Sequence, residues 1–131
     1  MNYYEDALQS RLFPNMKAKV CFLVGAYARN IMNIQAKKLQ GHKPFFKKLK
    51  DLKMKYDYIA KEVYTQAYSK FRQYSSRHDT LEQLITQCML EDDGTQLGDK
   101  EANYFFVMGA AYLNKNWEKE IINEEEQTIN E

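Results

Sequence analysis

Glycine and proline are scarce in this chain, with five and two among 131 residues. Because these two residues supply many turns, their scarcity argues against a turn-rich β fold and favours long, uninterrupted helices. No apolar run approaches the roughly 18 residues that a membrane span requires. The N-terminus, MNYYEDALQSRLF, carries acids before any apolar run and does not resemble a signal peptide. We therefore expect a cytoplasmic protein that has no membrane partner.

Residues that commonly carry catalytic or metal chemistry are also few. Cys21 and Cys88 lie in apolar helical sequence without CxxC spacing, so we expect both to be reduced and buried and expect no zinc site. His42 and His78 fall at expected turns, and the P-loop, GxGxxG and HExxH motifs are absent. The acids at 91–93 form either a solvated loop or a weak cation site, and only the second would suit a metal-dependent nuclease. The sequence predicts no enzyme, no cofactor and no bound metal.

Apolar residues recur at helical spacing throughout the chain, and strand-like alternation is missing. Pro14 should end a first helix, and Asn15 should cap the second. The first half of that second helix is apolar nearly all round, which predicts a place in the middle of a bundle. The expected fold is all-α: one bundle domain over 1–123 and an acidic, flexible tail over 124–131. It has about five main helices, over 3–13, 16–40, 57–75, 80–91 and 99–123, plus a short basic helix over 44–50.

One short pattern occurs twice in the chain, as Phe22-Leu-Val-Gly25-Ala and as Phe106-Val-Met-Gly109-Ala. Each copy places a glycine inside an expected helix, where glycine costs about 1 kcal/mol relative to alanine. Close approach of two helices would explain both glycines, so we predict that the two segments touch. The rival explanation is chance, because two short matches do not make a repeat.

Charge is segregated along the chain although the formal net charge is only +1. Between Arg29 and Lys61 ten Lys/Arg face two acids, and between Glu91 and Glu131 eleven acids face three lysines. A dense positive stretch is the footprint expected of a protein that binds phosphate backbones. The alternative at this point is an ordinary solvated helical face.

Lysine greatly outnumbers arginine in the basic stretch, which favours contacts to the backbone over readout of base edges. Phe45 and Phe46 are either stacking platforms for bases or, more often in such helices, core anchors. The residues that form the stretch or are candidates to extend it from elsewhere in the chain are Lys47, Lys48, Lys50, Lys53 and Lys55, with Arg29, Lys70, Arg72 and Arg77.

Four segments together resemble a known family. They read FLVGAYARNIMNIQAKKL, GHKPFFKKLKDLKMKYD, LEQLITQCML and LGDKEANYFFVMGAAYL. This succession resembles the helical C-terminal region of the large subunit of type I-B CRISPR Cascade complexes, over residues 15–117. In that family the same region is also made separately as the small subunit, and a chain of this length starting at Met1 is expected to be that small subunit.

The resemblance implies a non-catalytic role. Small subunits of this kind brace the heteroduplex of guide RNA and target DNA and hold the displaced strand of the R-loop. The implied partners are these nucleic acids, the Cascade large and backbone subunits, and neighbouring copies of the chain. The implied backbone contacts are Lys37, Lys38, Lys43, Lys47, Lys48, Lys50, Lys53 and Lys55.

A second hypothesis belongs to a different class. The chain would be a helical protein–protein adaptor that assembles with itself by docking its basic stretch on the acidic end, residues 118–131, of the next copy. That acidic end departs from the family, whose tail usually stops soon after the last helix.

Overall fold

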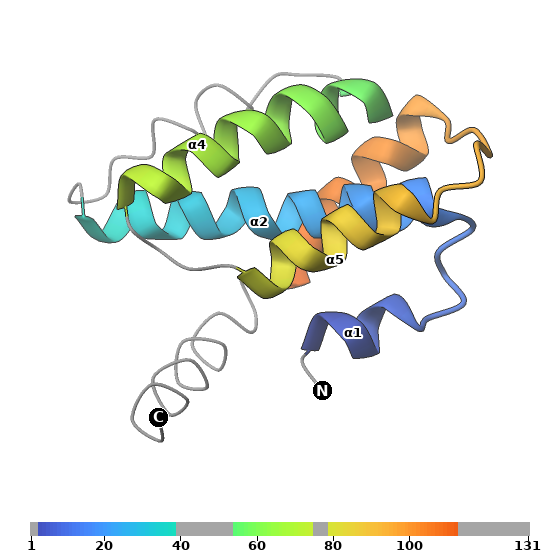
Figure 1. Cartoon of the computed structure of the whole chain (residues 1–131), viewed down its shortest axis with the longest axis horizontal. Helices are drawn as coiled ribbons and strands as arrows, with labels where there is room; N and C mark the ends of the chain where they lie inside the picture. The colour runs from blue at the N-terminus through green and yellow to red at the C-terminus, as the bar shows by residue number, and fades with distance from the viewer. Residues whose placement is uncertain (1–2, 39–53, 75–78, 113–131) are drawn as a thin grey trace.

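The computed structural model describes residues 3–38, 54–74 and 79–112, and within these ranges the protein is all-α, as predicted (Figure 1). The predicted helix over 44–50, the C-terminal part of the last helix and the tail lie outside the described residues. The elements are α1 (Tyr3–Leu8), α2 (Met16–Lys38), η1 (Tyr58–Val63), α4 (Tyr64–Tyr74), α5 (Asp79–Leu90) and a last helix, residues 99–112.

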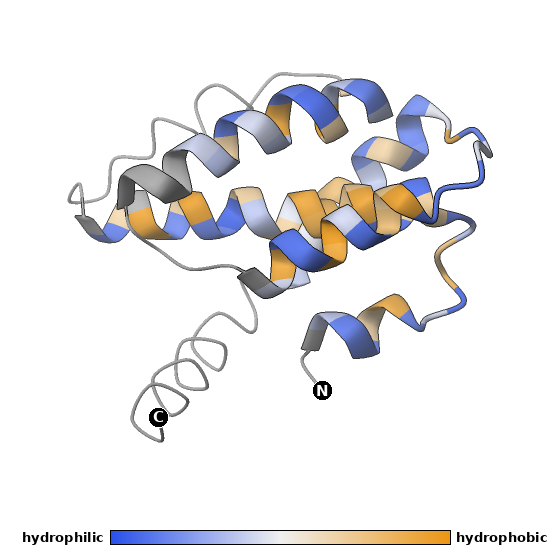
Figure 2. Cartoon of the chain, in the orientation of Figure 1, coloured by the Kyte–Doolittle hydropathy of each residue, from blue (hydrophilic) through white to orange (hydrophobic). Residues whose placement is uncertain are grey.

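Helix α2 is the centre of the bundle. Every residue from Val20 to Ala28 is buried, so this helix presents no solvent face over more than two turns. Asn15 caps its start, because the Asn15 Oδ1 atom accepts the Ala18 N–H at 3.0 Å. Figure 2 shows the hydrophobic residues concentrated where α2, α5 and the last helix meet. The predicted all-round apolar helix in the middle of a bundle is confirmed.

Two neighbours of α2 run in opposite directions along it. The Tyr27 hydroxyl donates to Glu82 on α5 at 2.7 Å, and Lys17, ten residues earlier, pairs with Asp92 just after α5. Helix α5 is therefore antiparallel to α2. The helix formed by η1 and α4 is parallel to α2, because Tyr56 lies beside Lys17 and Tyr64 packs on Tyr27 with ring centroids 5.3 Å apart.

Parallel neighbours cannot be joined by a short turn. The connection between α2 and η1 starts at the far end of α2, at Lys38, and ends at Met54, beside the first turns of α2. At 1.5 Å of rise per residue, the part of α2 from Lys17 to Lys38 is roughly 30 Å long. The lysine-rich segment 39–53 is therefore the long crossover of the bundle, and its two ends stand at opposite ends of α2.

The two glycine segments meet where the last helix crosses α2. A Cβ atom built on Gly25 would lie 2.8 Å from the carbonyl carbon of Phe106 and closer still to its oxygen. A Cβ atom on Gly109 would lie 2.7 Å from the carbonyl carbon of Phe22 and likewise closer to its oxygen. The two F-x-x-G segments thus pack against each other reciprocally, backbone against backbone. The predicted contact is confirmed.

Helix α1 is shorter than the predicted 3–13 and ends at Leu8. The Ser10 hydroxyl accepts the Leu12 N–H at 3.2 Å, a local bond that competes with helix continuation. Leu12, four residues after the buried Leu8, is 68% exposed. Phe13 points inward instead, with its ring 5.2 Å from that of Phe22 and 5.4 Å from that of Phe105.

The helix predicted over 57–75 begins with a wide π turn that the sequence did not indicate. In η1 the wider turn buries Ile59, Ala60 and Val63 together. Ala67, one turn further on, is also buried, so Ile59, Val63 and Ala67 form an inward stripe at a spacing of four.

We expect Gly25→Ala and Gly109→Ala each to lower the free energy of unfolding by at least about 3 kcal/mol, because a methyl group would collide with backbone atoms that cannot rotate away. Urea unfolding followed by circular dichroism measures this. The double variant should lower the free energy of unfolding by less than the sum of the two single effects, because the first methyl group already separates the helices.

Gly98→Ala is the matched control, since a Cβ atom there would meet only the Glu101 carboxylate at 3.7 Å. It should change the free energy of unfolding by less than about 1 kcal/mol. If all three substitutions lowered the free energy of unfolding equally, the close contact of the two helix backbones would be contradicted.

Candidate nucleic-acid interface

The structure describes the side chains of three of the predicted basic contacts. Lys37 is exposed in the last turn of α2, Lys55 is exposed just before η1, and Arg29 is half-buried in α2. Lys37 and Lys55 do not form one cluster, because they mark the two ends of the crossover. The other candidates stay predictions: Lys38, Lys70 and Arg72 lie in helices whose side chains there are not described, and Lys43, Lys47, Lys48, Lys50, Lys53 and Arg77 lie outside the described residues.

The C-terminal end of the crossover is clamped to the last helix by one asparagine. The Asn103 Nδ2 atom donates to the Met54 carbonyl at 2.6 Å, and the Asn103 Oδ1 atom accepts the Met54 N–H at 3.0 Å. The same Nδ2 atom also donates to the Asp99 carbonyl at 2.8 Å. Both backbone groups of Met54, which is itself buried, are thus satisfied by one side chain.

Sequence reasoning missed this role of Asn103. The only signal is an asparagine inside a helix, where its side chain usually competes with the backbone and is unfavourable. Here the side chain instead bonds a chain segment 49 residues away.

A partly buried ion pair holds the same region to the start of α2. The Lys17 Nζ atom lies 2.6 Å from Asp92 Oδ2, with the two side chains 12% and 17% exposed. The same ammonium group lies 5.3 Å from the centre of the Tyr56 ring, a cation–π distance. Lys17 therefore fixes the residues just after the crossover, and its charge is already balanced by Asp92.

The acids at 91–93 build a turn. Asp92 Oδ1 accepts the Gly94 N–H at 3.1 Å, and Asp93 Oδ1 accepts the Thr95 N–H at 2.9 Å. Gly94 has a φ of +86°, which favours glycine. The bonds from Thr95 lower the pKa of Asp93. Within the part of the chain that the structure describes, no group of three or more His, Cys, Asp or Glu side chains could hold a metal ion.

The predicted state of the cysteines is confirmed. Cys21 and Cys88 are both free and buried. Burial raises the pKa of the Cys21 thiol to about 12, so the reactive thiolate is disfavoured there.

Exposed charges of both signs surround the clamped end of the crossover. The lysines are Lys55 and Lys100, and the acids are Asp57, Asp99 and Glu101. The described surface here is close to neutral. The positive excess therefore belongs to residues 37–53, where seven lysines face one acid, Asp51.

The fold belongs to the class of all-α bundles. It has a buried central helix, a close crossing of two helix backbones and a lysine-rich crossover. Residues 3–126 match the family described as the C-terminal domain of CRISPR-associated protein TM1802, and the chain belongs to that family. The predicted relation to CRISPR Cascade proteins is thereby confirmed. Neither the curated proteins nor the solved structures contain a match to this chain. Among the described helices, none is both long and apolar enough to cross a membrane.

We expect Asn103→Ala to lower the free energy of unfolding by about 1–3 kcal/mol, because it leaves two buried backbone groups of Met54 without partners. The Met54 amide should also exchange its hydrogen faster, which hydrogen-exchange mass spectrometry measures on peptides that cover this residue. Gln83→Ala, at an exposed site on α5, is the control and should change neither quantity. Unchanged exchange at Met54 in Asn103→Ala would show that the clamp does not hold the crossover.

Proposed function

We propose that this chain acts in the cytosol as the non-catalytic small-subunit module of a type I-B Cascade complex. In this role it binds sugar–phosphate backbones without reading sequence, and so stabilises the heteroduplex of guide RNA and target DNA and the displaced strand of the R-loop. The observation that carries the proposal is the lysine-rich crossover in a member of a CRISPR-associated family.

The spacing of the two ends of the crossover suits a phosphate chain. Residues 37–55 contain eight lysines and one acid. The two ends of this stretch stand at opposite ends of α2, roughly 30 Å apart. A single strand of B-form DNA carries about nine phosphates over that length. The number of lysines therefore matches the charge of one strand over the length of the bundle.

Backbone contacts of this kind are sufficient for the proposed task. Formation of an R-loop exchanges one duplex for another of nearly equal stability, so modest binding free energy from the protein tips the balance. Such contacts must work on every target sequence. Lysine meets this requirement, because it binds phosphate as a point charge and carries little base preference.

The remaining chemistry of the chain supports a binding role. The Asp92 carboxylate is paired with Lys17, and both Asp92 and Asp93 accept bonds within their own turn. The two cysteines are buried thiols, as is usual for proteins of a reducing compartment. These groups are engaged in holding the fold.

We expect the triple substitution of Lys47, Lys48 and Lys50 by Glu to weaken binding of single-stranded and R-loop DNA by at least about tenfold. Each lost phosphate contact should also flatten the dependence of log K on log salt by about 0.7–0.9. Fluorescence anisotropy between about 50 and 200 mM salt measures both effects.

The matched control is Lys61→Glu, which reverses one exposed charge on η1 beyond the crossover. It should change DNA affinity by less than about twofold, since distant surface charges are screened. DNA binding that is unchanged in the triple variant, together with loss of self-association, would overturn the proposal and favour the adaptor hypothesis.

A further inference from the structure

A groove of about 530 Å³ lies between α4 and α5, beside the buried Tyr27 of α2. Both flanking helices pack on α2 (Figure 1). Helix α4 contributes Tyr64 and Tyr68 to one wall of the groove. Helix α5 contributes the other wall, which consists of Glu82, Gln83, Thr86, Gln87 and Leu90. Among the described residues that line the groove, none is a lysine or an arginine, so the charge of this lining is that of Glu82.

Two half-buried tyrosines give the groove an aromatic wall. The Tyr64 ring stands nearly perpendicular to the Tyr27 ring, at 87° with centroids 5.3 Å apart. The Tyr68 ring in turn stands at 80° to the Tyr64 ring, with centroids 6.4 Å apart. Because Tyr27 is fully buried, the core fixes where Tyr64 lies. A cation that stands over the face of either half-buried ring is attracted by its π electrons.

The Glu82 carboxylate is held in place across the groove from these rings. Its Oε1 atom accepts a hydrogen bond from the Tyr27 hydroxyl at 2.7 Å. Burial, and then the negative charge of Glu82, raise the pKa of Tyr64 to about 12. Glu82 is half-buried, and within the ranges that the structure describes it forms no ion pair. A carboxylate that is partly withdrawn from water and lacks a cation gains from a partner of positive charge.

The neutral groups beside Glu82 favour a planar cation that has several N–H donors. Gln87 uses its amide Nε2 atom to donate to Glu91 at 3.3 Å, so its amide oxygen faces no competing donor of its own group. Gln83 and Thr86 are exposed and add two more side-chain oxygens to this wall. Arginine carries five N–H donors in a plane that stacks on aromatic rings and pairs with a carboxylate through two bonds. The lysine ammonium group is compact and strongly hydrated, and fits such a wall less well.

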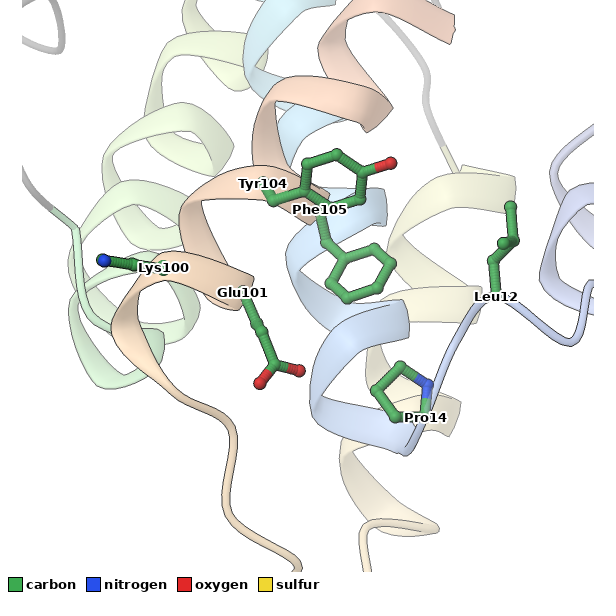
Figure 3. Close-up of a pocket in the computed structure, with 6 residues that line it drawn as sticks. All are labelled: Leu12, Pro14, Lys100, Glu101, Tyr104 and Phe105. Carbon is green, nitrogen blue, oxygen red and sulfur yellow. The ribbon is translucent and has the colours of Figure 1, made fainter.

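A second hollow, of about 520 Å³, provides a contrast (Figure 3). Its lining also combines aromatic rings with a carboxylate, because Tyr104 and Phe105 accompany Glu101. Lys100 lines the same hollow, so its charges are balanced and select neither sign. The groove between α4 and α5 differs in that no described lysine or arginine accompanies its carboxylate.

We propose that the groove between α4 and α5 binds an arginine side chain of a partner protein. The guanidinium group stacks on Tyr64 and Tyr68 and pairs with Glu82. Leu90, which is 80% exposed, offers apolar contact to the carbon stem of the arginine and to the residues that flank it. A nucleic acid is a poor occupant of this groove, because Glu82 repels phosphate. The inference thus goes beyond the proposed function and assigns a protein-binding site to a different face.

The test titrates the full chain, labelled with ¹⁵N, with the peptide acetyl-Gly-Arg-Gly-amide, whose ends are uncharged. The side-chain amide signals of Gln83 and Gln87 should shift saturably in NMR spectra. The same peptide with citrulline has nearly the same shape but no charge, so its affinity should be about tenfold lower. The peptide with lysine should bind at least about threefold more weakly than the arginine peptide, because it cannot stack or form two bonds.

Glu82→Gln removes the charge but keeps an oxygen that accepts the Tyr27 hydroxyl. It should weaken binding of the arginine peptide about tenfold and leave the urea midpoint of unfolding unchanged. Tyr68→Leu keeps an apolar side chain but removes a ring, and should weaken binding about threefold. Glu101→Gln is the matched control, because it removes the same charge from the hollow of Figure 3 and should stay within about twofold.

Several results would overturn the inference. If no saturable shift occurs at Gln83 and Gln87, or if the citrulline or lysine peptide binds as tightly as the arginine peptide, the groove does not recognise arginine. If Glu82→Gln and Glu101→Gln weaken binding equally, the peptide responds only to overall charge, and Glu82 serves only to accept the Tyr27 hydroxyl. A change of oligomeric state in Glu82→Gln, measured by sedimentation velocity, would assign the groove to a contact between copies instead of a partner protein.

Discussion

The contact of two helix backbones at Gly25 and Gly109 is the constraint on which the rest of the structure depends. Backbone atoms cannot change rotamer, so this crossing fixes the separation of α2 and the last helix more tightly than side-chain packing does. The last helix in turn carries Asn103, which clamps Met54, and Tyr104, which stays exposed. The position of the crossover's end therefore follows from a crossing at the centre of the core.

The direction of the helices explains why the basic residues lie where they do. The helix of η1 and α4 runs parallel to α2, and a parallel pair requires a connection as long as the helices themselves. In this chain, eight lysines occupy that connection and its two ends. The topology thus separates the two described ends of the lysine-rich segment, Lys37 and Lys55, by about the length of α2.

Much of this fold could be predicted from residue patterns. The central place of α2 follows from the run of apolar residues from Val20 to Ala28, and the helix crossing follows from two glycines that helices otherwise avoid. The end of α1 at Leu8 does not follow from the apolar spacing, and the local bond from the Leu12 N–H to the Ser10 hydroxyl competes with helix continuation there. The π turn of η1 and the clamp at Asn103 depend on tertiary contacts across the bundle, which a periodic pattern does not encode.

The candidate site was less predictable than the fold. The sequence indicated a positive stretch, but the separation of Lys37 from Lys55 depends on the parallel course of the two helices, which periodicity does not reveal. The ion pair of Lys17 with Asp92 joins residues 75 positions apart, and sequence alone offers no means of pairing them. Tyr104 is exposed beside two buried phenylalanines, whereas Phe106 lies at the crossing with α2.

The central claim is that the lysines of the crossover hold phosphate backbones of any sequence. The most direct test is the rate at which each lysine is acetylated, measured by mass spectrometry with and without DNA. We predict that the lysines of residues 43–53 become protected to the same extent by strands of unrelated sequence, while Lys61 does not. Protection that is absent from these lysines, equal at Lys61, or dependent on base sequence would contradict this account.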